Sequence, residues 1–162
     1  MVFGMRKLLL IFVLFLSNIV NAKTIEGLVV GVADGDTITL LDQQKNTYKI
    51  RLQGIDAPEK KQAFGEKSKQ SLHDLVHGKQ VHVEYDKEDK YGRIVGKITL
   101  DDLDICLQQL ALGMAWHYKK YQNEQSVADR VVYNDAELKS KSLRLGLWAD
   151  ETPMPPWEFR KK

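Results

Sequence analysis

The fold is decided by residues 24–55, which read TIEGLVVGVADGDTITLLDQQKNTYKIRLQGI. β-Branched and other apolar residues dominate this stretch, and turn-forming residues interrupt it, which is the pattern of short strands joined by turns. It predicts strands at 25–32, 37–41 and 48–55. Asp34-Gly35 is the tight-turn signal between the first two strands. We therefore expect these three strands to form a meander.

A helical pattern over residues 64–77 interrupts the strands, and Gly78 is expected to terminate that helix. Two more strands are predicted after it, at 81–85 and 93–100. Five strands with a helix inserted after the third are the arrangement of the OB-fold barrel.

Two further helices are expected after the fifth strand. Apolar residues at three- and four-residue spacing mark residues 103–111, ending at Gly113, and residues 133–147. The sequence therefore predicts an α+β protein, a five-stranded OB-fold β-barrel with three helices. Its one cysteine, Cys106, shares the apolar spacing of the second helix, so we expect a small buried hydrophobe without chemistry.

Residues 1–22 have the features of a secretory signal peptide. The basic pair Arg6-Lys7 precedes the apolar run Leu8–Leu16, and small residues end the segment at Ala22, the expected cleavage point. A membrane anchor is the alternative, but this run is far shorter than the roughly 20 apolar residues that a spanning helix requires. We expect a secreted or periplasmic protein with no stable membrane association after signal removal. The sequence does not distinguish the two compartments.

Removal of the signal peptide leaves 140 of the 162 residues, enough for one domain. We assign residues 23–148 to the barrel domain and residues 149–162 to a tail rich in Pro and Trp, expected to pack as irregular chain or to fray. The protein is expected to be a monomer. The remaining chain carries 22 basic and 22 acidic residues, because the leader holds two cations and no acid. Net charge therefore gives no sign of nucleic-acid binding.

Three short segments combine residue types that phosphodiester hydrolysis needs. They read DGDT at 34–37, RLQGIDAPE at 51–59 and DKYGR at 89–93. Each alone is more often an ordinary turn or loop. Together they place acids and arginines near several strand ends, which indicates a shared site.

Asp36 and Asp56 are the acids best placed to converge on a hard cation such as calcium, which prefers oxygen ligands. Ala57 adds a backbone carbonyl. Arg51 and Arg93 carry planar guanidinium groups that match a phosphate through paired N–H donors. The segments therefore predict a Ca²⁺ site beside a phosphate clamp.

Glu59 is the candidate for handling the attacking water, which it would orient or deprotonate. A carboxylate with an ordinary pKa of about 4.3 is a weak base toward free water. Orientation is therefore the larger expected contribution, and a role as general base stays open.

These three segments, in this order on this strand pattern, resemble the staphylococcal nuclease family over about residues 24–148. The resemblance implies an OB barrel with three helices and a calcium-dependent endo- and exonuclease that cuts DNA and RNA and leaves 3′-phosphate ends. It also implies roles for matched residues: Asp36, Asp56 and the Ala57 carbonyl as calcium ligands, Arg51 and Arg93 on the scissile phosphate, Glu59 on water, and Lys90 and Tyr91 on a terminal phosphate. The best-known member has threonine in place of Ala57 and a longer loop at 59–65, which leaves substrate preference open.

Tyr118 is the candidate aromatic for stacking on a base, although an ordinary surface tyrosine fits equally well. Two other functions remain: an OB-fold module that binds oligonucleotides without cutting them, and an exported adhesion or inhibitor protein that uses the barrel only as a scaffold. A pure binder gains nothing from acids beside an anionic phosphate, and a scaffold leaves Arg51 and Arg93 unexplained. The sequence does not rank DNA against RNA, because backbone contacts carry little base information.

Overall fold

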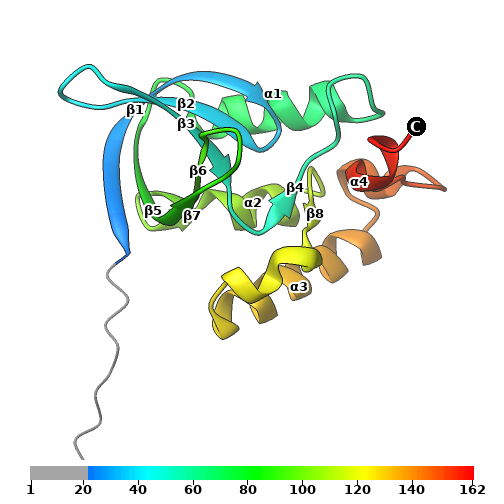
Figure 1. The fold of residues 1–162 in the computed structure, drawn as a ribbon. Helices are drawn as coiled ribbons and strands as arrows, with labels where there is room; N and C mark the ends of the chain where they lie inside the picture. Colours follow the sequence, from blue (N-terminus) through cyan, green and yellow to red (C-terminus); the bar gives the residue numbers. More distant parts are fainter. Residues whose placement is uncertain (1–21) are drawn as a thin grey trace, which may run out of the picture.

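Five strands close into a barrel in the computed structural model, which describes residues 22–162. The strands are β1 (Lys23–Asp34), β2 (Thr37–Leu41), β3 (Thr47–Leu52), β5 (Gln80–Glu88) and β6 (Ile94–Leu100). They lie in the order β3-β2-β1-β5-β6, and parallel pairing of β3 with β6 closes the barrel (Figure 1). The predicted OB-fold barrel of the α+β class is confirmed. The predicted signal peptide lies outside the described residues except for Ala22.

Inward-facing and outward-facing residues alternate along the barrel strands, and the inward-facing ones pack together in the core. In β2 and β3, residues such as Ile38, Leu40, Ile50 and Leu52 point inward and are buried, while their neighbours face outward. Burial of such side chains contributes about 1.5–3 kcal/mol each, so this face fixes the register of the strands.

The third strand was predicted to span residues 48–55, and the predicted end of this strand is wrong. β3 stops at Leu52, a turn follows, and Ile55–Asp56 form β4, which pairs with β8 (Trp116–His117) in a separate two-stranded sheet. Gly54 makes the break with φ +77°, and a side chain there would meet Gln125 at 2.3 Å. The turn redirects the chain away from the barrel just before Asp56.

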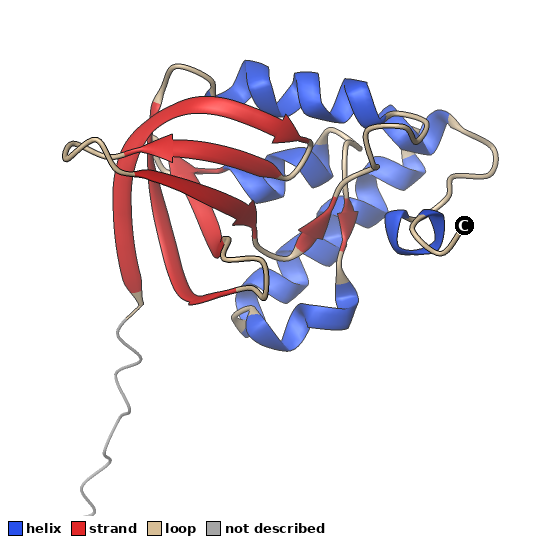
Figure 2. Cartoon of the chain, turned by 45° about the horizontal axis from the view of Figure 1, so that its top comes forward, coloured by secondary structure: helices blue, strands red, loops and turns tan. Residues whose placement is uncertain are grey.

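Three longer helices cover one side and one end of the barrel (Figure 2). α1 (Gly65–Val76) ends before Gly78, as predicted. α2 (Ile105–Ala111) begins later than the predicted residue 103, because Leu103–Asp104 continue as β7 beside β6. Asp104 then caps α2 by accepting a hydrogen bond from the Leu107 N–H at 3.0 Å. Cys106 is buried, as expected.

The third helix also differs from its prediction. α3 spans Val127–Ser142, starting at the cap residue Ser126, whereas the sequence pattern predicted residues 133–147. Arg144 has φ +52°, so the chain leaves the helix before Leu147, which lies instead in the short helix η2 (Gly146–Ala149). Another short helix, η1 (Lys119–Glu124), precedes α3.

The tail beyond residue 149 packs against the molecule instead of fraying. It forms a helical turn, α4 (Pro156–Phe159), beside β4 and β8 (Figure 1). Its Trp157 packs edge-on against Trp116 at 5.6 Å between ring centroids. Within residues 22–162, no helix combines the length and apolar character needed to cross a bilayer.

Candidate nuclease active site

A surface cavity of about 600 Å³ brings all nine predicted site residues together. Its lining includes residues from the end of β1 and the turn after it, from β3 and β4, from the turn between β5 and β6, and from the segment after β8. The predicted residues among them are Asp36, Arg51, Asp56, Ala57, Glu59, Lys90, Tyr91, Arg93 and Tyr118.

Asp36 is positioned by a tightly packed turn between β1 and β2. Its N–H donates to the Asp34 carboxylate at 3.1 Å. A side chain on Gly35 would meet the Ser68 hydroxyl at 1.8 Å, so only glycine fits there. The buried Gln109 amide donates to the Gly35 carbonyl at 2.8 Å and ties the turn to α2. Gln109 was not predicted, because this contact spans 74 positions of sequence.

Arg51 lies beside Asp36 because Thr37 and Arg51 are partners across β2 and β3. Its Nη2 is 3.2 Å from Asp36 Oδ2 and 3.0 Å from Asp56 Oδ1. Its Nη1 donates to the carbonyls of Leu52 and Ile55 at 3.0 and 2.9 Å. A phosphate oxygen must therefore approach Arg51 through Nε–H or displace one of these contacts.

Asp56 and Ala57 reach the cavity from β4. Only 2% of the Asp56 side chain is exposed. The Ala57 N–H donates to Asp36 Oδ2 at 2.7 Å, so the two aspartates, twenty residues apart in sequence, meet around the same backbone segment. This convergence is what the strand-end argument predicted.

Three acidic side chains, Asp34, Asp36 and Asp56, lie close together in the site. Burial and the neighbouring Asp36 carboxylate raise the pKa of Asp34 to about 6. Burial raises the pKa of Asp56 above its usual value, although Arg160 and Arg51 oppose this effect. Raised pKa values mean that ionisation of these acids is costly until a cation compensates them.

The donor chemistry of this site fits a hard divalent cation. Two carboxylates converge, a backbone carbonyl is adjacent, and oxygen is the ligand atom that calcium prefers. Residues 22–162 contain no cluster of three or more His, Cys, Asp or Glu side chains arranged to hold a metal ion. Asp36 and Asp56 would therefore need the Ala57 carbonyl and oxygens of water or substrate to complete the coordination.

Arg93 enters the cavity from the turn between β5 and β6. Parallel pairing of Arg51 with Val95 brings this turn to the end of β3. Arg93 Nε donates to Asp89 Oδ2 at 2.7 Å, which leaves its terminal nitrogens for other acceptors. Burial opposes ionisation of Asp89, but hydrogen bonds from Arg93 and Tyr91 hold its pKa below the usual value. Asp89 is thus a charged anchor for Arg93.

Lys90 and Tyr91 lie on the rim of the cavity. The Tyr91 ring is exposed, and the Lys90 ammonium lies 5.0 Å from its centroid. The Arg93 guanidinium lies 5.6 Å from the same ring. Their position suits contact with a phosphate outside the centre of the site.

Glu59 lies in the loop between β4 and α1, with 39% of its side chain exposed. Its N–H donates to the Gln62 side-chain oxygen at 3.1 Å, and its carbonyl accepts a hydrogen bond from the Gln62 N–H at 2.8 Å. The loop is therefore fixed at its base while the carboxylate faces the cavity.

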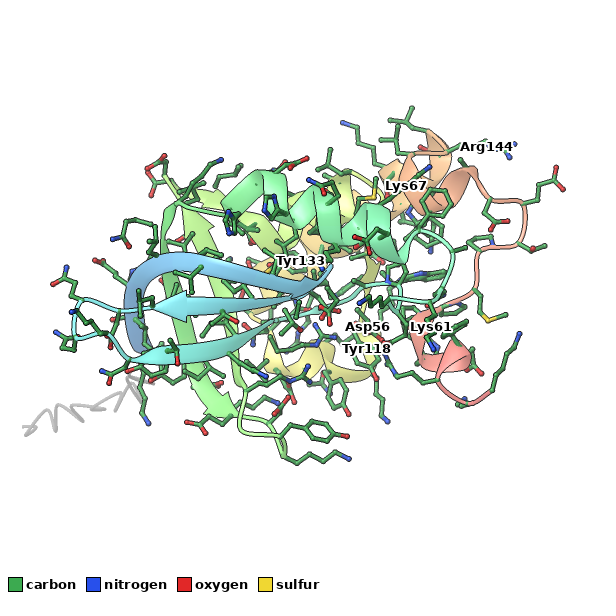
Figure 3. The ribbon with its side chains drawn as sticks, turned by 90° about the horizontal axis from the view of Figure 1, so that it is seen from above. Asp56, Lys61, Lys67, Tyr118, Tyr133 and Arg144 are labelled. Carbon is green, nitrogen blue, oxygen red and sulfur yellow. The ribbon has the colours of Figure 1, made fainter. Side chains whose placement is uncertain are left out.

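Tyr118 lines the cavity from the segment after β8, and its N–H donates to the Gly54 carbonyl at 2.8 Å. Its ring stacks against Trp157 of the tail, with centroids 5.4 Å apart and planes 7° apart. Asp56 and Tyr118 lie close together beside the C-terminal segment (Figure 3).

Arg160 is a further site residue that the sequence does not predict. Its guanidinium is 2.7 Å from Asp56 Oδ2 and 2.6 Å from Glu59 Oε1. These contacts join positions more than 100 residues apart. The prolines and tryptophan in the tail sequence do not predict these contacts.

Comparison with known proteins agrees with this geometry. A family model described as staphylococcal nuclease homologue matches residues 49–150. A Haemophilus influenzae protein named "Uncharacterized endonuclease" is 37% identical over 160 residues, which cover 97% of this chain and 86% of that protein. An Escherichia coli protein of the same name is 38% identical, with coverage of 98% and 99%. A Shigella flexneri micrococcal nuclease is 36% identical, with coverage of 83% and 80%. The chain therefore belongs to the staphylococcal nuclease family of phosphodiester-hydrolysing enzymes.

Proposed function

We propose that this chain is an exported, monomeric, calcium-dependent nuclease that hydrolyses phosphodiester bonds in both DNA and RNA and leaves 3′-phosphate ends. The observation that carries the proposal is the single cavity shared by Asp36, Asp56, Glu59, Arg51 and Arg93. The family membership of the chain supports the reaction class.

Asp36, Asp56 and the Ala57 carbonyl would hold the calcium ion. When bound, the ion would supply positive charge to a phosphate oxygen and to a nearby water. The two aspartates would otherwise repel an anionic substrate, so their place beside the arginines favours catalysis over simple binding.

Arg93 and Arg51 would bind the scissile phosphate and stabilise the charge that develops on its oxygens. Glu59 would orient the attacking water through its exposed carboxylate. Lys90 and Tyr91 would contact a terminal phosphate, and Tyr118 would stack on a base.

The test is incubation of the purified protein with DNA and with RNA, in excess calcium and in excess calcium chelator. We expect both polymers to be cut only with calcium, with restoration when calcium is added back. The fragments should carry 5′-hydroxyls that a polynucleotide kinase labels without prior phosphatase treatment. The Arg93→Ala protein, purified identically, controls for contaminating nucleases. Cleavage that persists in chelator would contradict the metal assignment, and binding without cleavage would favour the silent OB-fold module.

A further inference from the structure

The guanidinium of Arg160 holds two acids that the proposed reaction needs. Both oxygens of Asp56 accept from it, Oδ2 at 2.7 Å and Oδ1 at 3.3 Å. Its Nη1 also donates to Glu59 Oε1 at 2.6 Å. Arginine keeps its positive charge at all relevant pH values, so Arg160 supplies a fixed cation at this position.

Arg160 and a divalent cation therefore compete for the same carboxylates. A cation that binds Asp56 would lie within a few ångströms of the guanidinium, and like charges at that distance repel strongly in a partly buried site. Glu59 is affected as well, because a carboxylate held by arginine is a poorer partner for water. The observed arrangement thus differs from the one that cleavage requires.

The same tail also covers the candidate base-stacking residue. Trp157 stacks on the Tyr118 ring with planes 7° apart, as a nucleobase would. The Gln62 amide donates to the Met154 carbonyl at 2.6 Å and anchors the start of the segment. Together these contacts place one short segment over the acids and the aromatic ring.

We propose that residues 154–160 form a displaceable cap on the active site, in which Arg160 competes with the divalent cation and Trp157 competes with a nucleobase. This inference rests on the proposed function, because it takes Asp56 as a metal ligand and Tyr118 as a stacking residue. Calcium and substrate then release the cap by binding the groups that it holds.

The construction of the cap suits reversible release. The helical part, α4, spans only Pro156–Phe159, and 41% of the Arg160 side chain is exposed. Segments with few buried contacts open at low free-energy cost. While the cap is closed, the apparent calcium affinity is reduced by the fraction of molecules that are open.

The experiment measures calcium dissociation constants by isothermal titration calorimetry on the purified protein and three variants. Arg160→Gln removes the competing charge, and Trp157→Ala weakens the cap without changing charge. Arg144→Gln is the control, since it removes the same charge from an exposed arginine that lies away from Asp56 (Figure 3). Thermal unfolding of each variant verifies that the barrel is intact.

We expect Arg160→Gln to bind calcium about tenfold more tightly, as it would if about 90% of the wild-type molecules were capped. Trp157→Ala should bind about threefold more tightly, given the usual strength of an aromatic pair. Arg144→Gln should leave the affinity unchanged. In the wild-type protein, calcium should also speed hydrogen exchange of the amides of residues 157–162.

Equal calcium affinity in the wild type and Arg160→Gln would overturn the cap while leaving the proposed nuclease intact. The cap would also be overturned if only Arg160→Gln bound calcium more tightly and calcium did not speed hydrogen exchange in the tail. Arg160 would then weaken calcium binding through its charge alone. Absence of calcium binding to every protein would remove both the metal site and the cap.

Discussion

Replacement of Arg93 by alanine is expected to lower kcat for phosphodiester cleavage by about 10³-fold, with a smaller change in substrate affinity. Asp89 orients Arg93 through Nε, so its terminal nitrogens are aimed without large reorganisation. Such a donor acts mainly where charge develops in the transition state, and its loss therefore reduces turnover more than binding.

Steady-state rates on a short oligonucleotide, together with binding measured in chelator, separate these two effects. Arg93→Lys is a second variant to compare, because it keeps the charge but loses the paired donors. Its kcat should therefore remain far below that of the wild type. Arg144→Ala removes an arginine that does not line the cavity and should cut normally. Normal turnover by Arg93→Ala would mean that the phosphate clamp is misassigned.

The exchange of Glu59 for glutamine should lower kcat by about 10²-fold or more, which is the usual contribution of a group that orients and deprotonates water. The amide matches the carboxylate in shape, and the partial exposure of this side chain makes loss of the fold an unexpected outcome. Calcium affinity should not fall, because Glu59 is assigned to water and not to the ion.

The pH dependence of kcat distinguishes the two roles of Glu59. If Glu59 accepts the proton, the glutamine variant loses the acidic limb of the wild-type profile. If it only orients water, the limb remains at a lower rate. Glu66→Gln controls for the loss of one exposed acid, since Glu66 is exposed and lies outside the cavity lining. Turnover as fast as that of Glu66→Gln would contradict any catalytic role for Glu59.

The barrel could be predicted because its information is local. Alternation and the Asp34-Gly35 turn define β2 at 37–41 to the residue. The break at Gly54 could not be predicted, because it depends on close packing against Gln125 and Tyr133, which come from distant segments. The end of α3 was missed for a related reason: the apolar spacing continues to Leu147, but the backbone turns at Arg144.

In the candidate site, too, local motifs predict some residues, whereas others depend on contacts between distant segments. Residues within the three motifs converge on one cavity, since motif spacing reflects strand ends that the barrel brings together. Gln109, Trp157 and Arg160 carry no motif, and each reaches the site through contacts that exist only in the folded chain. Their roles follow from what they touch.

The most direct measurement is anomalous diffraction from crystals of the protein grown with calcium. We expect an ion between the Asp36 and Asp56 carboxylates and the Ala57 carbonyl, at about 2.3–2.6 Å from the ligand oxygens. Arg51 and Arg93 should face the open side of that ion. Saturating calcium that leaves these two aspartates without an ion, or that binds only elsewhere, would contradict the account.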